Sequence, residues 1–207
     1  MYARSTTIQA STSSVDQGIT YISDKVMPRV LEMAGCVGMS LLVDRESGRC
    51  IATTSWETEQ AMQDTRDAVQ SLRTEGAQAF GGTIDSVQEW EIALLHREHN
   101  TTEGTCVRVS WIKGDPAQAD RAIDNFRTSA LPKVEELRGF CSGSLMVDRS
   151  TGRLVGAFAY DSRDALEASR EAANGIRTAM ATELNAEVEE VREFELAIAH
   201  LRVPELV

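Results

Sequence analysis

Two histidines occupy matching places in the chain, and histidine is the side chain whose ordinary pKa lies closest to neutrality. His96 ends an alternating apolar stretch, and His200 ends a similar stretch 104 positions later. An imidazole at such a place could act as a general base toward a bound substrate. Alternatively, each histidine has a structural role at the end of its strand, where the ring's hydrogen bonds are satisfied by the protein. We predict His96 and His200 as catalytic candidates and keep the structural interpretation open beside them.

Pairs of carboxylates precede both histidines. Glu89 and Glu91 are two residues apart, as are Glu193 and Glu195, so each pair shares one face of a strand. Two close carboxylates can divide acid and base roles between them. The pattern favours the alternative, in which they form cross-strand ion pairs with an arginine of the first strand or end in solvent.

These matches belong to a repeat that runs through the whole chain. A shift of 104 residues aligns the sequence with itself without a gap. The matched pairs include Arg4 with Arg108, Pro28 with Pro132, Gly35 with Gly139, Asp44 with Asp148, Gly48 with Gly152, Arg66 with Arg170 and Arg73 with Arg177. A period of this length is domain-sized. We expect two domains, residues 1–100 and 101–207, that meet in the polar stretch 96–104.

Each half reads as strand, helix, strand, strand, helix, strand. The strands at 2–10 and 105–113 are β-branched and alternating, and a helix with an interior proline and a final glycine follows each of them. Two strands joined by a short turn come next. We expect the second helices at about 58–79 and 162–184 and the last strands at about 83–96 and 187–200. This order is the ferredoxin-like split unit.

The motif Val-Asp-Arg-x-x-Gly-Arg stands at the turn between the two middle strands of each half. Asp44 can bind backbone amides of the turn, and Gly48 can adopt the left-handed conformation at little cost. The motif therefore predicts hairpin turns. The alternative is an anion-binding rim formed by the motif's four arginines, which are Arg45, Arg49, Arg149 and Arg153.

A four-stranded sheet with helices on one face leaves its other face bare, and the two halves can cover each other. We therefore predict an α+β fold in which two tandem ferredoxin-like (βαββαβ) units pack sheet-to-sheet within one chain.

The stretch "LPKVEELRGFCSGSLMVDRSTGRLVGAFAYDSRDALEASREAA" at 131–173 resembles the antibiotic biosynthesis monooxygenase-like family of dimeric α/β-barrel proteins. The resemblance rests on Leu131-Pro132, Gly139-Phe140 and Tyr160-Asp161-Ser162, and on Met27-Pro28, Gly35 and Trp56-Glu57-Thr58 in the first half. It covers both halves, as a tandem duplication. It implies an intrachain α/β barrel and a cofactor-independent monooxygenase that acts on a small aromatic or quinol-type substrate. The alternatives are a non-catalytic small-ligand-binding or stress-related barrel and a purely structural pseudo-dimer.

The resemblance also implies site residues. Trp56 and Tyr160 stand where the family's pocket aromatic lies, and their N–H or O–H could orient a phenolic substrate or hold dioxygen beside it. Arg66 and Arg170 are candidates for stabilising a substrate anion, with exposed, ion-paired arginines as the alternative. Phe158 is predicted at the substrate pocket of the second half, where it could also act as a plug.

The sequence departs from the haem-degrading members of this family. Those members carry a histidine nine or ten residues past the aromatic, where this chain has Thr65-Arg66 and Ser169-Arg170, and neither first strand has their asparagine. We expect no haem and no other cofactor. We also expect no metal, because His96 and His99 at a strand end do not converge and the second half lacks the second histidine.

Composition limits the remaining classes of function. A net charge of −11 over 207 residues, without a basic stripe, disfavours nucleic acid. No run reaches the about 18 apolar residues that cross a bilayer, and the start of the chain has no apolar signal core. We expect a cytoplasmic protein with four reduced cysteines and no membrane partner. Its expected partner is a small apolar or aromatic molecule, and it is either a monomer with an internal pseudo-two-fold axis or a homodimer of it.

Overall fold

The computed structural model describes residues 1–99, 101 and 104–206. Residues 100, 102 and 103 of the expected linker lie outside the described residues, as does residue 207. The chain forms two compact units. Unit 1 contains Met1–Trp90 and Glu195–Val203, and unit 2 contains Glu91–Phe194 and Pro204–Val207.

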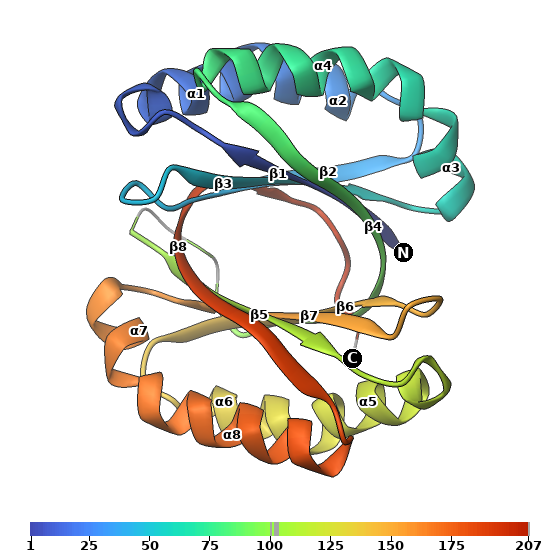
Figure 1. Ribbon diagram of the computed structural model, residues 1–207, viewed down its shortest axis with the longest axis vertical. Helices are drawn as coiled ribbons and strands as arrows, with labels where there is room; N and C mark the ends of the chain where they lie inside the picture. Colours follow the sequence, from blue (N-terminus) through green and yellow to red (C-terminus); the bar gives the residue numbers. More distant parts are fainter. Residues whose placement is uncertain (100, 102–103, 207) are drawn as a thin grey trace. The chain divides into compact units, whose positions relative to one another are not determined.

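Unit 1 is built from the first repeat. Its strands are β1 (Tyr2–Gln9), β2 (Cys36–Val43), β3 (Arg49–Trp56) and the first part of β4 (Thr83–Arg97), and its α-helices are α1 (Val15–Tyr21), α2 (Met27–Leu31), α3 (Glu59–Asp64) and α4 (Arg66–Ala79). β3 lies between β1 and β2 and pairs antiparallel with both. In Figure 1, α1, α2 and α4 cover one face of this sheet.

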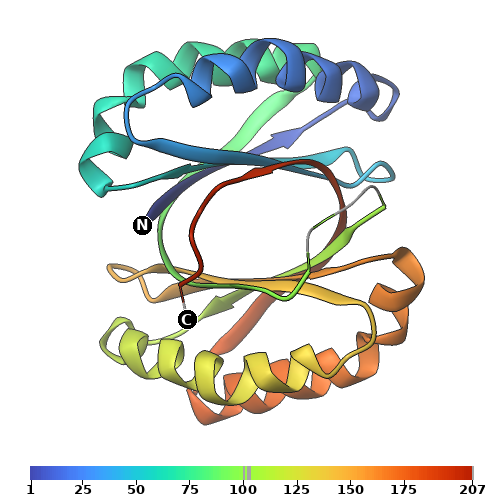
Figure 2. The ribbon, with the colours of Figure 1, turned by 180° about the vertical axis from the view of Figure 1, so that it is seen from behind.

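Unit 2 repeats this pattern. Its strands are β5 (Cys106–Lys113), β6 (Phe140–Asp148), β7 (Arg153–Tyr160) and the first part of β8 (Glu187–Leu201), and its α-helices are α5 (Ala119–Asn125), α6 (Leu131–Glu135), α7 (Arg163–Ala168) and α8 (Arg170–Glu183). β7 pairs antiparallel with β5 and β6. Figure 2 shows α6, in yellow, and α8, in orange, on the same face of this sheet.

The last strand of each repeat ends in the other unit. In unit 1, β2 pairs with the end of β8, with Val43 opposite Glu195. In unit 2, β6 pairs with the end of β4, with Val147 opposite Glu91. The hydrogen-bonded order of the described strands is β1-β3-β2-β8-β5-β7-β6-β4, which closes into a barrel. This confirms the predicted α+β barrel of two βαββαβ repeats, whereas the domain boundary near residue 100 stays a prediction.

The first helix of each repeat departs from α-helical geometry just before its interior proline. A π-helical turn, Ile22–Val26, precedes α2, and Phe126–Ala130 precedes α6 in the same way. Pro28 and Pro132 then occupy the first turn of the following α-helix. The wider turn accommodates the proline ring without ending the helix.

The second helix of each repeat is not continuous, and the prediction of one helix was wrong here. α3 gives way to α4 at Thr65, and α7 gives way to α8 at Ser169. The Thr65 hydroxyl donates to the carbonyls of Ala61 and Met62, at 3.1 and 2.9 Å. Such side-chain bonds compete with the helical backbone bonds and bend the helix.

The hairpin turns follow the motif. Asp44 Oδ1 accepts the backbone N–H groups of Glu46 and Ser47 at 3.0 and 3.3 Å, and Gly48 has a φ of +74°. The second turn repeats this geometry at Asp148. The motif is therefore confirmed as turn chemistry.

The arginines of the motif do not support an anion-binding rim. Arg45 pairs with Asp16 and Glu195, and Arg149 pairs with Asp120 and Glu91. These carboxylates already occupy the positions that an external anion would take.

Candidate functional site

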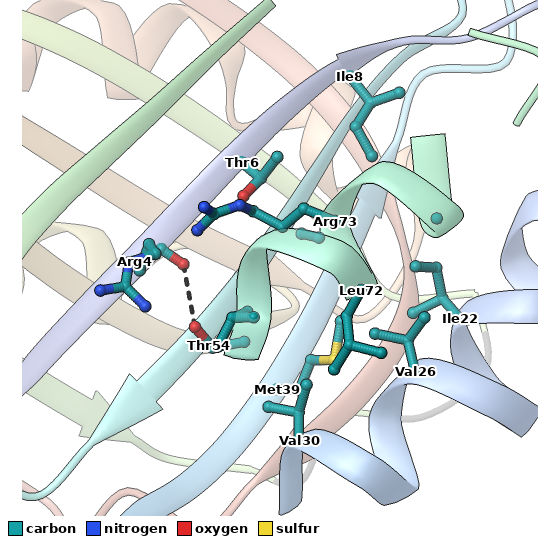
Figure 3. Close-up of a pocket in the computed structure, with 13 residues that line it drawn as sticks. Arg4, Thr6, Ile8, Ile22, Val26, Val30, Met39, Thr54, Leu72 and Arg73 are labelled. Carbon is teal, nitrogen blue, oxygen red and sulfur yellow. Dashed lines mark hydrogen bonds between the residues drawn. The ribbon is translucent and has the colours of Figure 1, made fainter. Parts of the chain in front are cut away.

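A pocket lies inside unit 1, between the sheet and the helices (Figure 3). β1 contributes Arg4, Thr6 and Ile8, which share one face because alternate residues of a strand point the same way. The cavity volume is about 30 Å³. That is room for one or two water-sized groups, such as the oxygens of a small ligand's head.

Helix α4 forms the opposite wall. Val69, Leu72, Arg73 and Gly76 line the pocket, and their spacing of three, four and seven residues places them on one helical face. Figure 3 shows Arg4 and Arg73 toward one end of the pocket, whereas Ile22 lies at the other end. The pocket therefore has a cationic end and an apolar end.

Arg4 is almost fully buried, with 2% of its surface exposed. Its Nε donates to Glu89 Oε1 at 3.0 Å, and its Nη2 donates to the Met62 carbonyl at 2.6 Å. This is the cross-strand ion pair that the sequence predicted. Nη1 of Arg4 is buried and has no hydrogen-bond partner among the described residues.

Glu89 is the centre of a small charged cluster. It accepts hydrogen bonds from Arg4, from Gln63 at 2.8 Å and from Arg66 at 3.2 Å. Burial by itself raises the pKa of this carboxyl, but the bonds from Gln63 and Arg4 outweigh burial, so its pKa is lowered. Glu89 therefore stays ionised at neutral pH and is a poor general base.

Arg73 adds a second guanidinium to the pocket. Burial lowers its pKa, and the positive charge of Arg4 lowers it further. Its Nη1 is buried without a hydrogen-bond partner among the described residues. The cluster of Arg4, Arg66 and Arg73 faces one carboxylate, Glu89, so positive charge is in excess at this end of the pocket.

Trp56 is fully buried and acts on the pocket only through a neighbour. Its Nε1 donates to Thr54 Oγ1 at 3.1 Å, and Thr54 lines the pocket. The Thr54 hydroxyl in turn donates to the Arg4 carbonyl at 3.3 Å. A direct role of Trp56 in binding stays a prediction. The hydrogen bond from its indole N–H holds the Thr54 hydroxyl in place.

The corresponding region of unit 2 is filled differently. Phe126 and Phe158, which correspond to Ile22 and Thr54, stack with ring centroids 5.4 Å apart. A Cβ on Gly143 would lie 3.1 Å from the Phe158 ring, so the glycine makes room for it. This is the arrangement expected of a plug, and the role of Phe158 toward a substrate stays a prediction.

Tyr160 takes the place of Trp56 in unit 2. It is fully buried, and Arg108 lies with its guanidinium carbon 5.8 Å from the ring centroid. Its hydroxyl makes no hydrogen bond among the described residues. Burial raises the pKa of this hydroxyl, although Ser169 and Arg108 lower it in part.

The predicted histidines do not line the unit 1 pocket. His96, in unit 2, lies with Nε2 3.1 Å from Glu135 and Nδ1 2.9 Å from Glu205. His200 lies opposite Met39 in the β2–β8 ladder. Their predicted role as general bases therefore has no support from the pocket's lining, which contains no imidazole, carboxylate or thiol among the described residues.

The predicted substrate arginines lie outside the pocket lining. Arg66 and Arg170 are exposed and pair with Glu89 and Glu193, at 3.2 and 2.9 Å. The sequence predicted Arg4 as an ion-pair partner and Arg73 only as a repeat match, and it predicted neither residue in a pocket. A usable signal was present, because Arg73 falls four residues after Val69, on the apolar stripe of its helix.

Two further properties of the described residues bear on the site. No group of three or more histidine, cysteine, aspartate or glutamate side chains lies close enough to hold a metal ion. None of the described helices is both long and apolar enough to cross a membrane.

Comparison with known proteins places the chain in a family. It is 51% identical over 207 residues to the uncharacterized protein Rv2557 of Mycobacterium tuberculosis, covering 100% of this chain and 92% of that protein. It is 53% identical over 208 residues to the uncharacterized protein Rv2558 of the same organism, covering 100% and 88%. The chain belongs to the family of these mycobacterial proteins. No model of a known protein family matches it.

Solved structures identify the fold. An anthrone oxidase-like protein superposes with a TM-score of 0.67 at 12% identity, covering 100% of this chain and 95% of that one. A ferredoxin-fold protein related to antibiotic biosynthesis monooxygenases, from Listeria monocytogenes, gives 0.55 at 10% identity, covering 95% of each chain. A heme-degrading enzyme from the same species gives 0.53 at 8%, covering 94% and 99%. The protein has the monooxygenase-like α/β-barrel fold.

Proposed function

We propose that this protein binds a small apolar or aromatic molecule in the pocket of unit 1. The observation that carries the proposal is the pocket itself, which has an apolar wall and a cationic end. It lies in the first repeat, which has Thr54 at the position where the second repeat has Phe158. Pockets lined mainly by apolar groups with a few placed polar groups are typical of small-molecule sites.

The ligand's body needs more room than the empty cavity offers. Met39 and Arg73 are unbranched side chains of the lining, and both can change rotamer without moving the backbone. Arg73 is partly exposed on α4, so its displacement opens the pocket toward solvent. Binding is therefore expected to shift these two side chains.

A substitution borrowed from the second repeat tests this function. Gly76 lines the pocket and corresponds to Met180, and a Cβ there would already lie 3.0 Å from Ile22. Gly76→Met fills the pocket, and the gain in helix propensity, about 1 kcal/mol, offsets part of the crowding. Gly175→Met is the matched control, because Gly175 is exposed and a Cβ there meets nothing within 4 Å.

Native mass spectrometry of the purified protein is the measurement. We expect a mass excess that disappears on denaturation, persists in Gly175→Met and is absent from Gly76→Met. If no form retains a ligand and none binds small aromatic molecules on titration, the proposed function is refuted.

A second candidate function is oxygenation of a phenolic substrate without a bound cofactor. It is supported by the anthrone oxidase-like neighbour, which shares the fold, and by guanidinium groups that could stabilise a phenolate. Such a reaction places one oxygen atom of dioxygen in the product and releases the other as water. Oxygen uptake with anthrone as probe tests it: catalysis predicts uptake that Gly76→Met abolishes and Gly175→Met retains.

A further inference from the structure

We infer that the ligand of unit 1 is an organic anion whose acidic group lies between the Nη1 atoms of Arg4 and Arg73. The inference rests on the proposed function and assigns its ligand class. A carboxylate or a phenolate attached to a small apolar body has the required chemistry.

The first observation is the pair of unused donors. A buried guanidinium normally has partners for all its N–H groups, because each unpaired group loses its hydration without compensation. Nη1 of Arg4 and Nη1 of Arg73 are both buried, both belong to residues that line the same cavity, and neither has a hydrogen-bond partner among the described residues. An anion in the cavity would supply acceptors for both.

The second observation is the charge at this end of the pocket. Arg4 already shares Glu89 with Arg66, and no described carboxylate forms an ion pair with Arg73. Two guanidinium groups that line the same cavity repel each other, and an anion bound between them would offset this repulsion. In a chain with a net charge of −11, this cationic end is a local feature against the overall charge.

The third observation is that the second repeat satisfies the same two arginines internally. Nη1 of Arg108, the counterpart of Arg4, donates to Ser169 Oγ at 2.8 Å. Nη2 of Arg177, the counterpart of Arg73, donates to Asn174 Oδ1 at 2.7 Å. The first repeat has Gln70 at the position of Asn174, and its Thr65 hydroxyl bonds only helix carbonyls.

The two repeats therefore differ in two linked ways. Where Phe126 and Phe158 fill the core, the arginines bond within the protein. Where the pocket is present, both arginines keep a free donor. Among the described residues, the two unpaired donors and the pocket that could use them therefore occur together in unit 1.

Benzoate and benzamide are the matched probes, since they share a ring and nearly the same shape but differ in charge. We expect benzoate to bind the full-length protein at least about tenfold more tightly than benzamide, the usual margin of a charge-assisted bond. Arg73→Met should remove this preference. Arg177→Met should leave it unchanged, because Arg177 belongs to the repeat whose arginines bond internally. Both affinities are measured by calorimetric titration.

Each outcome decides one question. Equal binding of both probes, blocked by Gly76→Met, would refute the anionic ligand and leave the binding function intact. Binding of neither probe would refute the anion inference. If the native spectrum of the purified protein also showed no mass excess, the binding function would be refuted as well. Because Arg73 is partly exposed, its replacement should not unfold the chain. Arg73→Lys, which keeps the charge and loses the fork, should bind benzoate with intermediate affinity.

Discussion

Gly18, in helix α1, lies directly against the ring of Phe80, and the second repeat has a different solution at the same place. A Cβ on Gly18 would lie 2.1 Å from Phe80 Cδ1 and 2.3 Å from Cε1, far inside the ordinary separation of about 3.5–4.0 Å. The repeat counterparts are Ala122 and Leu184, which are 4% and 3% exposed. In the first repeat the smallest residue, Gly18, faces the large ring of Phe80. In the second repeat the larger Ala122 is matched with the smaller Leu184.

The two competing effects of Gly18→Ala can be compared in magnitude. Replacing a helical glycine by alanine gains up to about 1 kcal/mol. Overpacking a buried site costs about 1–3 kcal/mol, and the upper end applies because Phe80 is fully buried and overlaps by more than an ångström. We expect a net loss of about 2 kcal/mol and a fall in Tm of about 4–8 °C.

A double-mutant cycle tests the explanation. Phe80→Leu alone should destabilise by about 1 kcal/mol or more, since it leaves a cavity beside the glycine. Gly18→Ala with Phe80→Leu copies the second repeat and should return close to the wild-type stability, a coupling of about 2–3 kcal/mol. Urea unfolding is the assay, and Gly175→Ala, on an open helix surface, should slightly stabilise. Additive losses, or a stabilised Gly18→Ala, would show that the ring does not set the size of this residue.

Two further predictions concern titrating groups. Hydrogen bonds from Gln63 and Arg4 hold the pKa of Glu89 below its ordinary value despite burial. The ionised carboxyl therefore stabilises the fold fully above the pKa of the unfolded chain, about 4.3. This contribution is lost as the pH falls through the lowered pKa of the folded protein. Glu89→Gln should therefore be less stable than wild type at pH 7, with the gap narrowing toward pH 3 in urea titrations; a constant gap would contradict the linkage. Burial and the negative charge of Asp44 raise the pKa of the Cys50 thiol to about 11. At pH 8 only about one thiol in a thousand is then ionised. Iodoacetamide should therefore alkylate Cys50 at least about 100-fold more slowly in the folded protein than in urea. Equal rates by peptide mass spectrometry would show that Cys50 is neither buried nor shifted.

The residues proposed for chemistry divide according to the kind of signal that pointed to them. Trp56 was singled out by a family resemblance, and the structure places it behind the pocket, where it holds Thr54. Arg66 was chosen from its place on the second helix, but it is the first residue of α4, at the end of the face that lines the cavity, and there it is exposed and pairs with Glu89. Arg73 lies on the same helix two turns later, on the apolar stripe, and reaches the cavity.

Local and periodic features could be determined from the sequence alone. Turn signals act over a few residues, so Gly48 and Gly152 were placed correctly at positive φ in the hairpin turns. Gly35 and Gly139 were expected to end the first helices, but those helices are capped by Glu32 and Glu136, and the two glycines lie in the turns that follow. The order of elements in each repeat followed from the same signals. The barrel could be predicted because each repeat's sheet needs a cover on its second face.

Only the tertiary structure decided where the ends of the last strands pair and which repeat keeps a pocket. Strand partners of β4 and β8 depend on residues about 50 and 150 positions away in the chain, which no local pattern records. Whether a buried arginine keeps a free donor depends on a single hydroxyl reaching it, as Ser169 does for Arg108 and Thr65 does not for Arg4. Such differences arise from side-chain packing in three dimensions, because two repeats with the same pattern of elements can satisfy the same buried charge in different ways.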